Sequence, residues 1–455
     1  MLFDEAVALI AGLVPLSLEW IVFVLHLASI FLLVYGCFRV SASIFSDFAA
    51  RWGGVAMVAA LITMPVAGTK LYIFDQHLHP RSLATAFLLL AVSDILHDRL
   101  KRPLLWLVLS AVMHPQMTAF GLVYCLFLII RKPLSRLSAS ATSGLFGILP
   151  FMGPAPAAWS EAMATRTHHL LQNWHWYEWL GIFAPLSLLW LLRTEARKIN
   201  NPRLEFISTR TAAFGALFFA AAVVISINRS LLRFATLQPL RSLQIVYLML
   251  FLLGGGLIGQ YVLKHRPLRW LLLFIPVSAA MFLGQRAIFP SSHHIELPFS
   301  GPCNKWVEAF DWIRVNTPRE AIFVMHPFYM DLDGEDNHGF RAYAERSMVA
   351  DRMKDAGVSA LFPGLADRWA GQVRDLDGWE HFGRADFTRL ANKYGVSWAV
   401  LEKGHPAADT LECPYRNDRV SVCATGQQAS PREIPSDPSD TLQQHAFTPL
   451  PALHP

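Results

Sequence analysis

The stretch YIFDQHLHPR, residues 72–81, separates two apolar runs, and the architecture of the whole chain can be worked out from it. One run ends at Phe74 and the next begins at Leu83. Four polar side chains lie between the runs: Asp75, His77, His79 and Arg81. Charges and imidazoles at the boundary of two membrane spans are costly unless they meet water, one another or a ligand. We therefore predict that this segment lies at one membrane face and contributes to a site there.

The composition is that of a membrane protein with a soluble part. Of its 455 residues, 53% are hydrophobic and 16% are charged, against about 25% charged in ordinary soluble proteins. Residues 1–287 contain 23 Lys and Arg and 11 Asp and Glu, a net of +12; residues 288–455 contain 16 and 23, a net of −7. The basic excess indicates cytoplasmic loop charge. Because no nucleic-acid-binding motif accompanies it, we expect no nucleic-acid partner.

Apolar runs of membrane-spanning length recur through the first two thirds of the chain. The predicted spans are residues 18–38, 54–74, 82–96, 143–153 with their flanks, 179–192, 211–227, 242–263 and 270–286. The run 103–130 is interrupted by His114 and Pro115, and since proline removes a backbone donor we predict two short arms there.

Lys and Arg in the short loops predict the orientation of these spans. Basic clusters lie at residues 99–102, 131–136, 193–210 and 264–269. All four can be cytoplasmic if the two short arms enter the membrane and return to the side from which they entered. The loops at 75–81, 114–115, 154–178 and 228–241, and everything after residue 287, then face outward. Arg229, Arg233 and Arg241 on the outward side are an opposing signal.

Residues 288–425 predict a small soluble α/β domain. Helical spacing of Trp306, Phe310 and Ile313 and the strand pattern AIFVM at 321–325 open it. Further strands are expected at 347–350 and 398–401 and helices at 352–361 and 385–394, giving a mixed or parallel sheet. The expected organisation is a remnant of an outward loop at 1–17, a membrane bundle at 18–287, this domain, and a Pro- and Ser-rich disordered tail at 426–455.

The cysteines of the acidic part raise the question of compartment. Cys413 and Cys423 flank a predicted turn between two short strands. A disulfide between them would fit an oxidising compartment. Spacing alone does not bring two Cβ atoms together, so two free thiols remain the alternative.

Several sequence patches carry a family resemblance. They are DQHLHPRSLATAFLLLAV from Asp75, AVMHP from Ala111, WIRVNTPREAIFVMHP from Trp312, FRAYAERSMVADRMK from Phe340 and DFTRLANKYGVSWAVLE from Asp386. In these patches and in layout the chain resembles the GT-C superfamily of polytopic glycosyltransferases, in particular bacterial members of unassigned activity. The run from Trp312 is also similar to the start of the outward domain of oligosaccharyltransferase catalytic subunits.

The resemblance implies a fold and an activity. The implied fold is a GT-C-like helical bundle of about eight to ten membrane segments followed by a small α/β domain. The implied activity is inverting transfer of a sugar from a polyprenyl-phosphate carrier at the outer face of a bacterial inner membrane, with the C-terminal domain periplasmic. GT-C enzymes begin with a cytoplasmic N-terminus, one span and a long acidic loop, and here residues 1–17 match only the tail of that loop. We expect either a start further upstream or a reduced member, and no catalytic aspartate is carried over to Asp4 or Glu5.

The candidate site residues come from the polar loops. Asp75 or His77 could act as the base, and arginine can hold a phosphate through two hydrogen bonds. The candidate substrate-binding residues are His79, Arg81, His114, Arg166, His168, Trp174, His175, Arg229, Arg233, Arg341 and Arg346. Asp331 and Asp333 could hold a divalent cation, Mg²⁺ or Mn²⁺. The structural alternatives are interfacial charges that pair with one another, a tryptophan belt, headgroup anchors, a solvated acidic loop and ion pairs inside the domain.

Two functions therefore remain open at the level of sequence. The preferred hypothesis is the glycosyltransferase, with membrane lipid and a polyprenyl-phosphate sugar as partners. The alternative is a non-catalytic GT-C-like scaffold that binds a lipid or a protein partner, favoured by the missing first loop. A transporter ranks third, because coupling sites of transporters lie near the midplane of the bilayer.

Overall fold

The computed structural model describes residues 2–130, 156–290, 297–298, 304–332 and 339–426. The chain divides into two compact units. Unit 1 comprises residues 1–301 and the short segment 356–367, and unit 2 comprises residues 302–355 and 368–455. The predicted span 143–153, the predicted tail and Asp333 lie outside the described residues.

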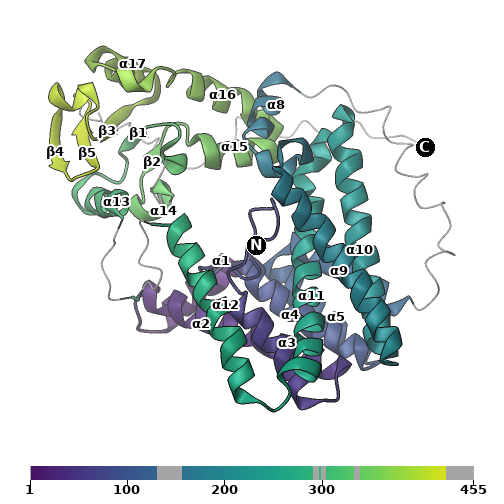
Figure 1. The fold of residues 1–455 in the computed structure, drawn as a ribbon. Coiled ribbons are helices and arrows are strands. Elements are labelled where there is room, and N and C mark those ends of the chain that lie inside the picture. The colour runs from purple at the N-terminus through teal and green to yellow at the C-terminus, as the bar shows by residue number, and fades with distance from the viewer. Residues whose placement is uncertain (1, 131–155, 291–296, 299–303, 333–338, 427–455) are drawn as a thin grey trace, which may run out of the picture. The chain divides into compact units, whose positions relative to one another are not determined.

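Unit 1 is built of helices, most of which are labelled in Figure 1. The helices are α1 (Leu2–Leu13), α2 (Leu18–Ile44), α3 (Phe48–Ala60), α4 (Pro80–Leu96), α5 (Arg102–Met113), α6 (Pro115–Ile129), α8 (Ala157–Ala164), α9 (Trp176–Lys198), α10 (Pro202–Ile227), α11 (Leu243–Ile258) and α12 (Pro267–Ile288). Short 3-10 helices η3 (Thr167–His169), η4 (Leu171–Asn173), η5 (Arg229–Leu237) and η6 (Pro239–Ser242) join them, and the π-helical turn η7 (Gly259–Leu263) extends α11.

Four helical segments are long and apolar enough to cross a membrane. They are Leu18–Ile44, Pro202–Ile227, Leu231–Leu263 and Pro267–Ile288. In the apolar 18-residue window of each segment, 78% of the third is buried inside the protein and only 6% of the fourth. The α11 segment is therefore the central helix of the unit, whereas α12 turns most of its apolar surface away from the described residues.

The break predicted at His114 and Pro115 is confirmed, since α5 ends at Met113 and α6 begins at Pro115. The predicted span 54–74 is wrong. Helix α3 already ends at Ala60, and residues 61–79 form an irregular segment with an isolated antiparallel bridge between Pro65 and Tyr72. Proline has no amide hydrogen for a helical bond, and the turn that follows Pro65 replaces the helix with local bonds.

Helices α3 and α11 pack backbone against backbone through glycines. A Cβ atom on Gly54 would lie 2.6 Å from the carbonyl oxygen of Leu252, and one on Gly255 would lie 2.6 Å from that of Gly53. Side chains at these positions would force the helices apart. Small residues allow such close approach in membrane helices, where packing rather than water exclusion holds helices together.

Unit 2 is a mixed five-stranded sheet with helices, labelled in Figure 1. The strands are β1 (Ile322–Met325), β2 (Ser347–Met348), β3 (Val396–Glu402), β4 (Glu412–Arg416) and β5 (Val420–Ala424), in the spatial order β2-β1-β3-β5-β4. The helices are α13 (Lys305–Asn316), η8 (Tyr329–Asp331), α14 (Phe340–Ala344), η10 (Trp379–His381), α17 (Arg384–Tyr394) and η11 (Pro406–Asp409), while α15 (Arg352–Leu361), η9 (Pro363–Leu365) and α16 (Ala366–Arg374) include residues of unit 1.

The sheet matches the sequence pattern that predicted it. Strands β1, β2 and β3 run parallel, and β5 and β4 run antiparallel to their neighbours. Trp306, Phe310 and Ile313 are all buried on one face of α13 in the core of this unit. Helix α17 ends at Tyr394 and is followed by Gly395, which takes the left-handed conformation (φ 74°) that favours glycine.

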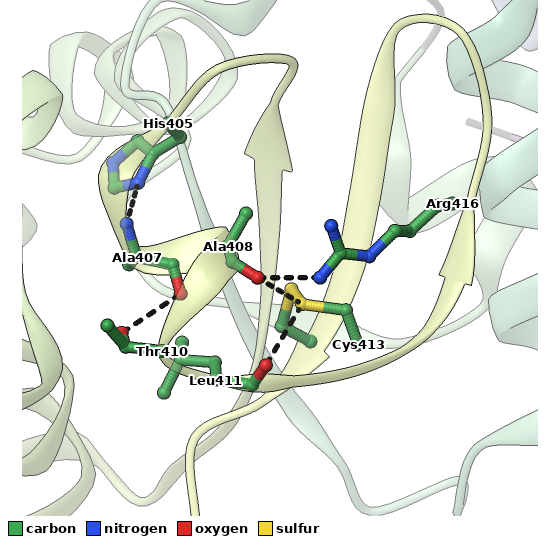
Figure 2. Close-up of a disulfide and its surroundings, with 8 residues drawn as sticks. His405, Ala407, Ala408, Thr410, Leu411, Cys413 and Arg416 are labelled. Atoms are coloured by element: carbon green, nitrogen blue, oxygen red, sulfur yellow. Dashed lines mark hydrogen bonds between the residues drawn. A yellow bond between two sulfur atoms is a disulfide. The ribbon is translucent and has the colours of Figure 1, made fainter.

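A disulfide joins the last two strands, between Cys413 of β4 and Cys423 of β5. Figure 2 shows its surroundings, where the Arg416 guanidinium donates a hydrogen bond of 2.6 Å to the carbonyl oxygen of Ala408. The Nδ1 atom of His405 accepts the backbone N–H of Ala407 at 3.2 Å, which caps η11 beside the bond. The disulfide thus lies in a hydrogen-bonded corner of the sheet.

Candidate functional site

The irregular segment 61–79 is fixed in place by the central helix. Gln244 of α11 is buried, and its side-chain amide donates to the carbonyl oxygens of Tyr72 (3.1 Å) and Ile73 (3.0 Å). Within the segment the N–H of Val66 donates to the carbonyl of Leu71 at 2.8 Å. Buried backbone groups need such partners, so the segment can hold its polar side chains in a defined arrangement without regular secondary structure.

Asp75, which is buried, forms an ion pair with the half-buried Arg81 at the end of this segment. The Nε atom of Arg81 donates to Oδ2 of Asp75 at 2.6 Å, a second bond joins Nη2 to Oδ1, and the Ser82 hydroxyl donates to Oδ2 at 3.0 Å. Two parallel bonds between a guanidinium and a carboxylate are the strongest form of this pair. Both oxygens of the predicted base are therefore engaged, and the pair orients Arg81.

Two histidine–proline pairs start the helices that meet at this site. The Nδ1 atom of His79 accepts the N–H of Arg81 at the start of α4, and Nδ1 of His114 accepts the N–H of Met117 at the start of α6, both at 3.2 Å. Proline follows each cap at the first helical position, where its missing N–H costs nothing. The two rings lie 6.1 Å apart.

The caps determine what these imidazoles can do. Burial first, and then neighbouring arginines, lower the pKa of His79 and of His114 to about 4. Both rings are therefore neutral near pH 7, and because Nδ1 accepts a hydrogen bond the ring hydrogen is on Nε2. Each histidine can offer one N–H donor at Nε2.

Arg241 enters the site from the turn before α11. Its Nη1 atom donates to the side-chain oxygen of Gln116 at 3.5 Å, and the amide of Gln116 donates to the carbonyl of Leu237 at 2.8 Å. The turn contains Gln238 in the left-handed conformation (φ 48°) directly before Pro239. The Nε atom of Arg241 is buried and has no hydrogen-bond partner among the described residues.

The adjacent pair His168 and His169 completes the site. Their rings lie 4.4 Å apart, and both Nδ1 atoms are buried without a hydrogen-bond partner in the described part of the chain. Together with Thr69, Gln238 and Arg241 they line a small cavity with room for about one water molecule. Buried polar atoms without partners are uncommon in folded proteins and call for an explanation such as a ligand or ordered water.

We call this group of side chains the cationic cluster. Its members are Lys70, Asp75, His79, Arg81, His114, Arg166, His168, His169 and Arg241, which act on one another electrostatically. Burial, followed by these neighbouring charges, lowers the pKa of His168 to about 2 and that of His169 to about 3. With four cationic side chains, one carboxylate and neutral imidazoles, the cluster carries an excess of positive charge.

The arrangement favours an anion. Guanidinium groups, imidazole N–H donors and the N-termini of α4 and α6 all favour negative charge. The site does not fit a divalent cation, since its one carboxylate is already bonded to Arg81 and Ser82 and the remaining charges repel a metal. The described residues contain no group of three or more His, Cys, Asp or Glu arranged to hold a metal ion.

The cluster unites most of the outward polar residues predicted from the sequence. Asp75, His79, Arg81, His114, Arg166 and His168 belong to it. His77 is exposed and acts electrostatically on His26 of α2 instead. Trp174 is buried in the core of unit 1, and its indole N–H donates to the carbonyl of His168 at 3.4 Å. His175 is exposed at the start of α9, Arg233 is exposed, and the side chain of Arg229 is not described.

The predicted residues of unit 2 make structural contacts within that unit. Arg346 is buried and donates five hydrogen bonds, to the Thr317 hydroxyl and to four backbone carbonyls. Arg341 forms a bidentate ion pair with Asp355 at 2.7 and 2.9 Å. Substrate binding by either would require these bonds to break. Of the proposed metal ligands, the side chain of Asp331 is not described and Asp333 lies outside the described residues.

Sequence reasoning missed Arg241 and Lys70 as members of the site. Arg241 was grouped with the outward arginines that oppose the predicted orientation. A usable signal was present, because the segment QPLR places Arg241 two residues before the strongly apolar helix α11. The repeated His-Pro pair at 79–80 and 114–115 is a second signal, since both start helices at the same site.

Comparison with known proteins gives one match, to unit 2. A family model described as a domain of unknown function, DUF6798, matches residues 304–356, from the start of α13 into α15. No curated protein and no solved structure matches the chain. The GT-C resemblance therefore remains an expectation from the sequence.

Proposed function

We propose that this is an integral membrane protein that binds the phosphate group of a polyprenyl-phosphate-linked sugar in the cationic cluster and transfers the sugar, as GT-C enzymes do. One observation carries the proposal. Arg81 and Arg241 converge with the N-termini of two helices and with four neutral histidines, and Asp75 is the one carboxylate that acts on these groups. Such an excess of positive charge, together with buried donors that have no partner among the described residues, is most simply explained by an anionic ligand.

Each group would have a distinct part in binding. The guanidinium of Arg241 would hold the phosphate, because its Nε–H is buried and unpaired among the described residues. The Nε2 hydrogens of His79 and His114 would donate to phosphate or sugar oxygens. The cavity is small in this structure, so the loops carrying His168 and Gln238 would have to separate when a ligand enters.

The cluster would also favour the transfer itself. When an acceptor attacks the anomeric carbon and the bond to phosphate oxygen breaks, negative charge grows on the departing polyprenyl phosphate. Cations and N–H donors already fixed around that group stabilise such a charge without reorganisation. These donors supply the role that a metal ion has in other transferases.

A specific observation favours the second candidate, a lipid-binding protein without transfer. Inverting transfer needs a base that accepts the acceptor's proton, and both oxygens of Asp75 are bonded to Arg81 and Ser82. The two candidates share the binding step and differ in whether Asp75 can be released from this pair.

The location proposed is a bacterial inner membrane with unit 2 on the outer side. The four long apolar helices fit a membrane protein. The disulfide between Cys413 and Cys423 supports an oxidising compartment for unit 2. The basic loops at the ends of α4 and α9 support a cytoplasmic position for the opposite end of the bundle.

The decisive experiment measures binding and transfer separately. Purified protein in lipid nanodiscs is titrated with polyprenyl phosphate and then supplied with a radiolabelled polyprenyl-phosphate sugar. Arg241→Gln, which removes the charge and keeps polarity, should weaken binding by about tenfold or more. Arg241→Lys should restore part of it. The matched control is Arg266→Gln, an exposed arginine in the α11–α12 turn.

Equal affinity in Arg241→Gln and in the control would reject the cationic cluster as the lipid-phosphate site. Binding followed by transfer supports the glycosyltransferase. Binding without transfer by a chain of verified start supports the second candidate and rejects the first.

A further inference from the structure

A second polar site lies at the opposite end of unit 1, between the α2–α3 turn and the α9–α10 turn. The turns border an open cavity of about 520 Å³, lined by Ser43, Phe45, Ser46, Arg51, Asn200 and Arg203 among others. This volume is within the range of about 300–1,000 Å³ that is usual for small-molecule sites. None of the described residues that line it is acidic.

Two arginines from different helices are hydrogen-bonded to the end of α2. Nε of Arg51 donates to the carbonyl of Phe45 at 2.9 Å, and Nη1 of Arg203 donates to the carbonyl of Ser43 at 3.0 Å. The last carbonyls of a helix lack partners within the helix, so each arginine caps α2 through one N–H. Their other N–H groups make no hydrogen bond with a described residue.

The capping bonds restrict the positions of both guanidinium groups. One nitrogen of each is bonded to the same end of α2, and both arginines are among the residues that line the cavity. The N-terminus of α10 begins at this cavity with Pro202, which adds favourable potential for an anion. The nearest carboxylate in sequence, Asp47, accepts the N–H of Ala50 at 2.8 Å and caps α3.

The surroundings indicate a lipid. Phe48 and Trp52, on the first two turns of α3 beside Arg51, are 66% and 42% exposed. Their rings lie 6.2 Å apart, and Trp52 also contacts Phe38 of α2 at 5.1 Å. Exposed aromatic rings next to basic side chains at the ends of apolar helices are typical of the interface between acyl chains and headgroups.

From these observations we infer that Arg51 and Arg203 form a binding site for a phosphate group, supplied by the headgroup of an anionic phospholipid. The two guanidiniums bind the phosphate oxygens from both sides, and the acyl chains run along Phe48 and Trp52. This site is separate from the cationic cluster, and its ligand belongs to the opposite leaflet.

The test compares lipid binding of charge-removed and charge-conserving variants. Native mass spectrometry of detergent-purified full-length protein is carried out with phosphatidylglycerol and, in parallel, with zwitterionic phosphatidylcholine. Wild type should retain phosphatidylglycerol preferentially. The double variant R51Q/R203Q should bind it about tenfold or more weakly. R51K/R203K should keep most of the binding, which separates loss of charge from loss of the fold.

Two further arms identify the source of the phosphate. Thermal unfolding is measured with phosphatidylglycerol and with inorganic phosphate at matched phosphate concentration. A shift caused by the lipid alone supports the inference. An equal shift of the unfolding temperature with inorganic phosphate that disappears in R51Q/R203Q would overturn the inference that the ligand is a lipid. The site would then be assigned to a soluble phosphate.

The controls make the result independent of the proposed function. Arg266→Gln removes an exposed cation near the same end and should leave phosphatidylglycerol binding unchanged. A loss of binding in R51Q/R203Q with unchanged binding in Arg266→Gln supports the site whether or not the cationic cluster binds a lipid phosphate. If R51Q/R203Q binds phosphatidylglycerol as tightly as Arg266→Gln does, the site does not exist as described.

Discussion

At the scale of single residues, the site is defined by polar atoms that the protein itself leaves incompletely bonded. His168 and His169 place two Nδ1 atoms in a buried position without a partner among the described residues. In contrast, Arg346 in unit 2 uses its donors fully. Buried donors that are fully bonded stabilise a fold, whereas unbonded ones cost free energy. The polar atoms of the cationic cluster that have no partner among the described residues therefore lower the stability of the folded protein.

This cost predicts a pH dependence. Burial, followed by neighbouring cations, lowers the pKa of His168 and His169 from 6.5 to about 2 and about 3. Between pH 6.5 and these values the unfolded chain binds protons that the folded chain does not, so stability falls as the pH falls. The unfolding temperature in nanodiscs should therefore decrease from about pH 7.5 to about pH 5, and less steeply in H168Q/H169Q. An unchanged slope in that variant, equal to that of the exposed-residue control His265→Gln, would contradict this account.

At the scale of elements, the contact between α3 and the α11–η7 segment depends on glycine. Gly53 and Gly255 lie directly against each other, and a Cβ on Gly259 would collide with the carbonyl of Ala49. Backbone contact of this kind leaves no space for even one methyl group. The position of α11 against α3 therefore depends on glycines, which have no side chain at the contact.

We expect Gly255→Ala to destabilise the protein by about 1–3 kcal/mol, because the added methyl overpacks the α3–α11 contact. Gly254 in the same helix has no atom within 4 Å of an added Cβ. Gly254→Ala should therefore be neutral or stabilise by about 0.5–1 kcal/mol, since alanine is the better helix former. Unfolding in mixed micelles measures both. Equal effects of the two substitutions would show that the helices do not pack as described.

The link between β4 and β5 is a second element whose contribution can be measured. The disulfide closes a short loop, with a separation of 10 residues between its cysteines. Loops of this size give about 2–3 kcal/mol of stabilisation in the chain-entropy account. Cys423→Ser should increase hydrogen exchange in residues 412–424 by a corresponding factor and leave α2 and α11 unaffected. Unchanged hydrogen exchange in the two strands would show that the disulfide does not stabilise this part of unit 2.

The elements show what sequence could predict. Apolar length and periodicity placed α2, α4, α9, α10, α11 and α12, and the break at His114 and Pro115, because these depend on local patterns. The span predicted at 54–74 failed because the apolar run continues past Ala60 while the backbone helix does not. Leu71 and Ile73 are buried in an irregular segment. Gln244, which lies 172 residues after Tyr72 in the sequence, holds this segment by a hydrogen bond to the Tyr72 carbonyl. Burial of this kind gives the same apolar composition as a membrane helix.

The site was predictable in part, because the predicted spans place its loops at one face. Polar residues on loops at one predicted face were expected to meet, and His79, Arg81, His114 and His168 do meet. What could not be predicted is which of them would be paired. The bonds between Asp75 and Arg81 and the capping role of both histidines depend on backbone geometry that no spacing rule specifies.

At the scale of the molecule, unit 1 has two chemically different ends. One contains the cationic cluster, built from the 61–79 segment and the turns before α6 and α11. The other contains the α2–α3, α4–α5, α9–α10 and α11–α12 turns, joined by contacts such as Ser43 with His97 at 3.2 Å. Most exposed Lys and Arg among the described residues of unit 1 belong to this second end, which fits a cytoplasmic surface.

Labelling with a membrane-impermeant maleimide tests this arrangement. In a Cys303→Ser background, the exposed residues Lys70 and His265 are replaced singly by cysteine. Lys70→Cys should react in intact cells, and His265→Cys only after lysis. Cys37 and Cys125 are buried and contribute little background. The opposite pattern would show that the bundle has the reverse orientation in the membrane, and it would contradict a site at the outer face.

The histidine caps of α4 and α6 have one last consequence. An imidazole that already receives a backbone hydrogen at Nδ1 can take up a proton only by giving up that bond. Protonation and fraying of the first helical turn are therefore a single event. Since the rings of His79 and His114 lie 6.1 Å apart, acid would loosen both helix starts at one point. The site would lose its shape in the same step in which it gained charge.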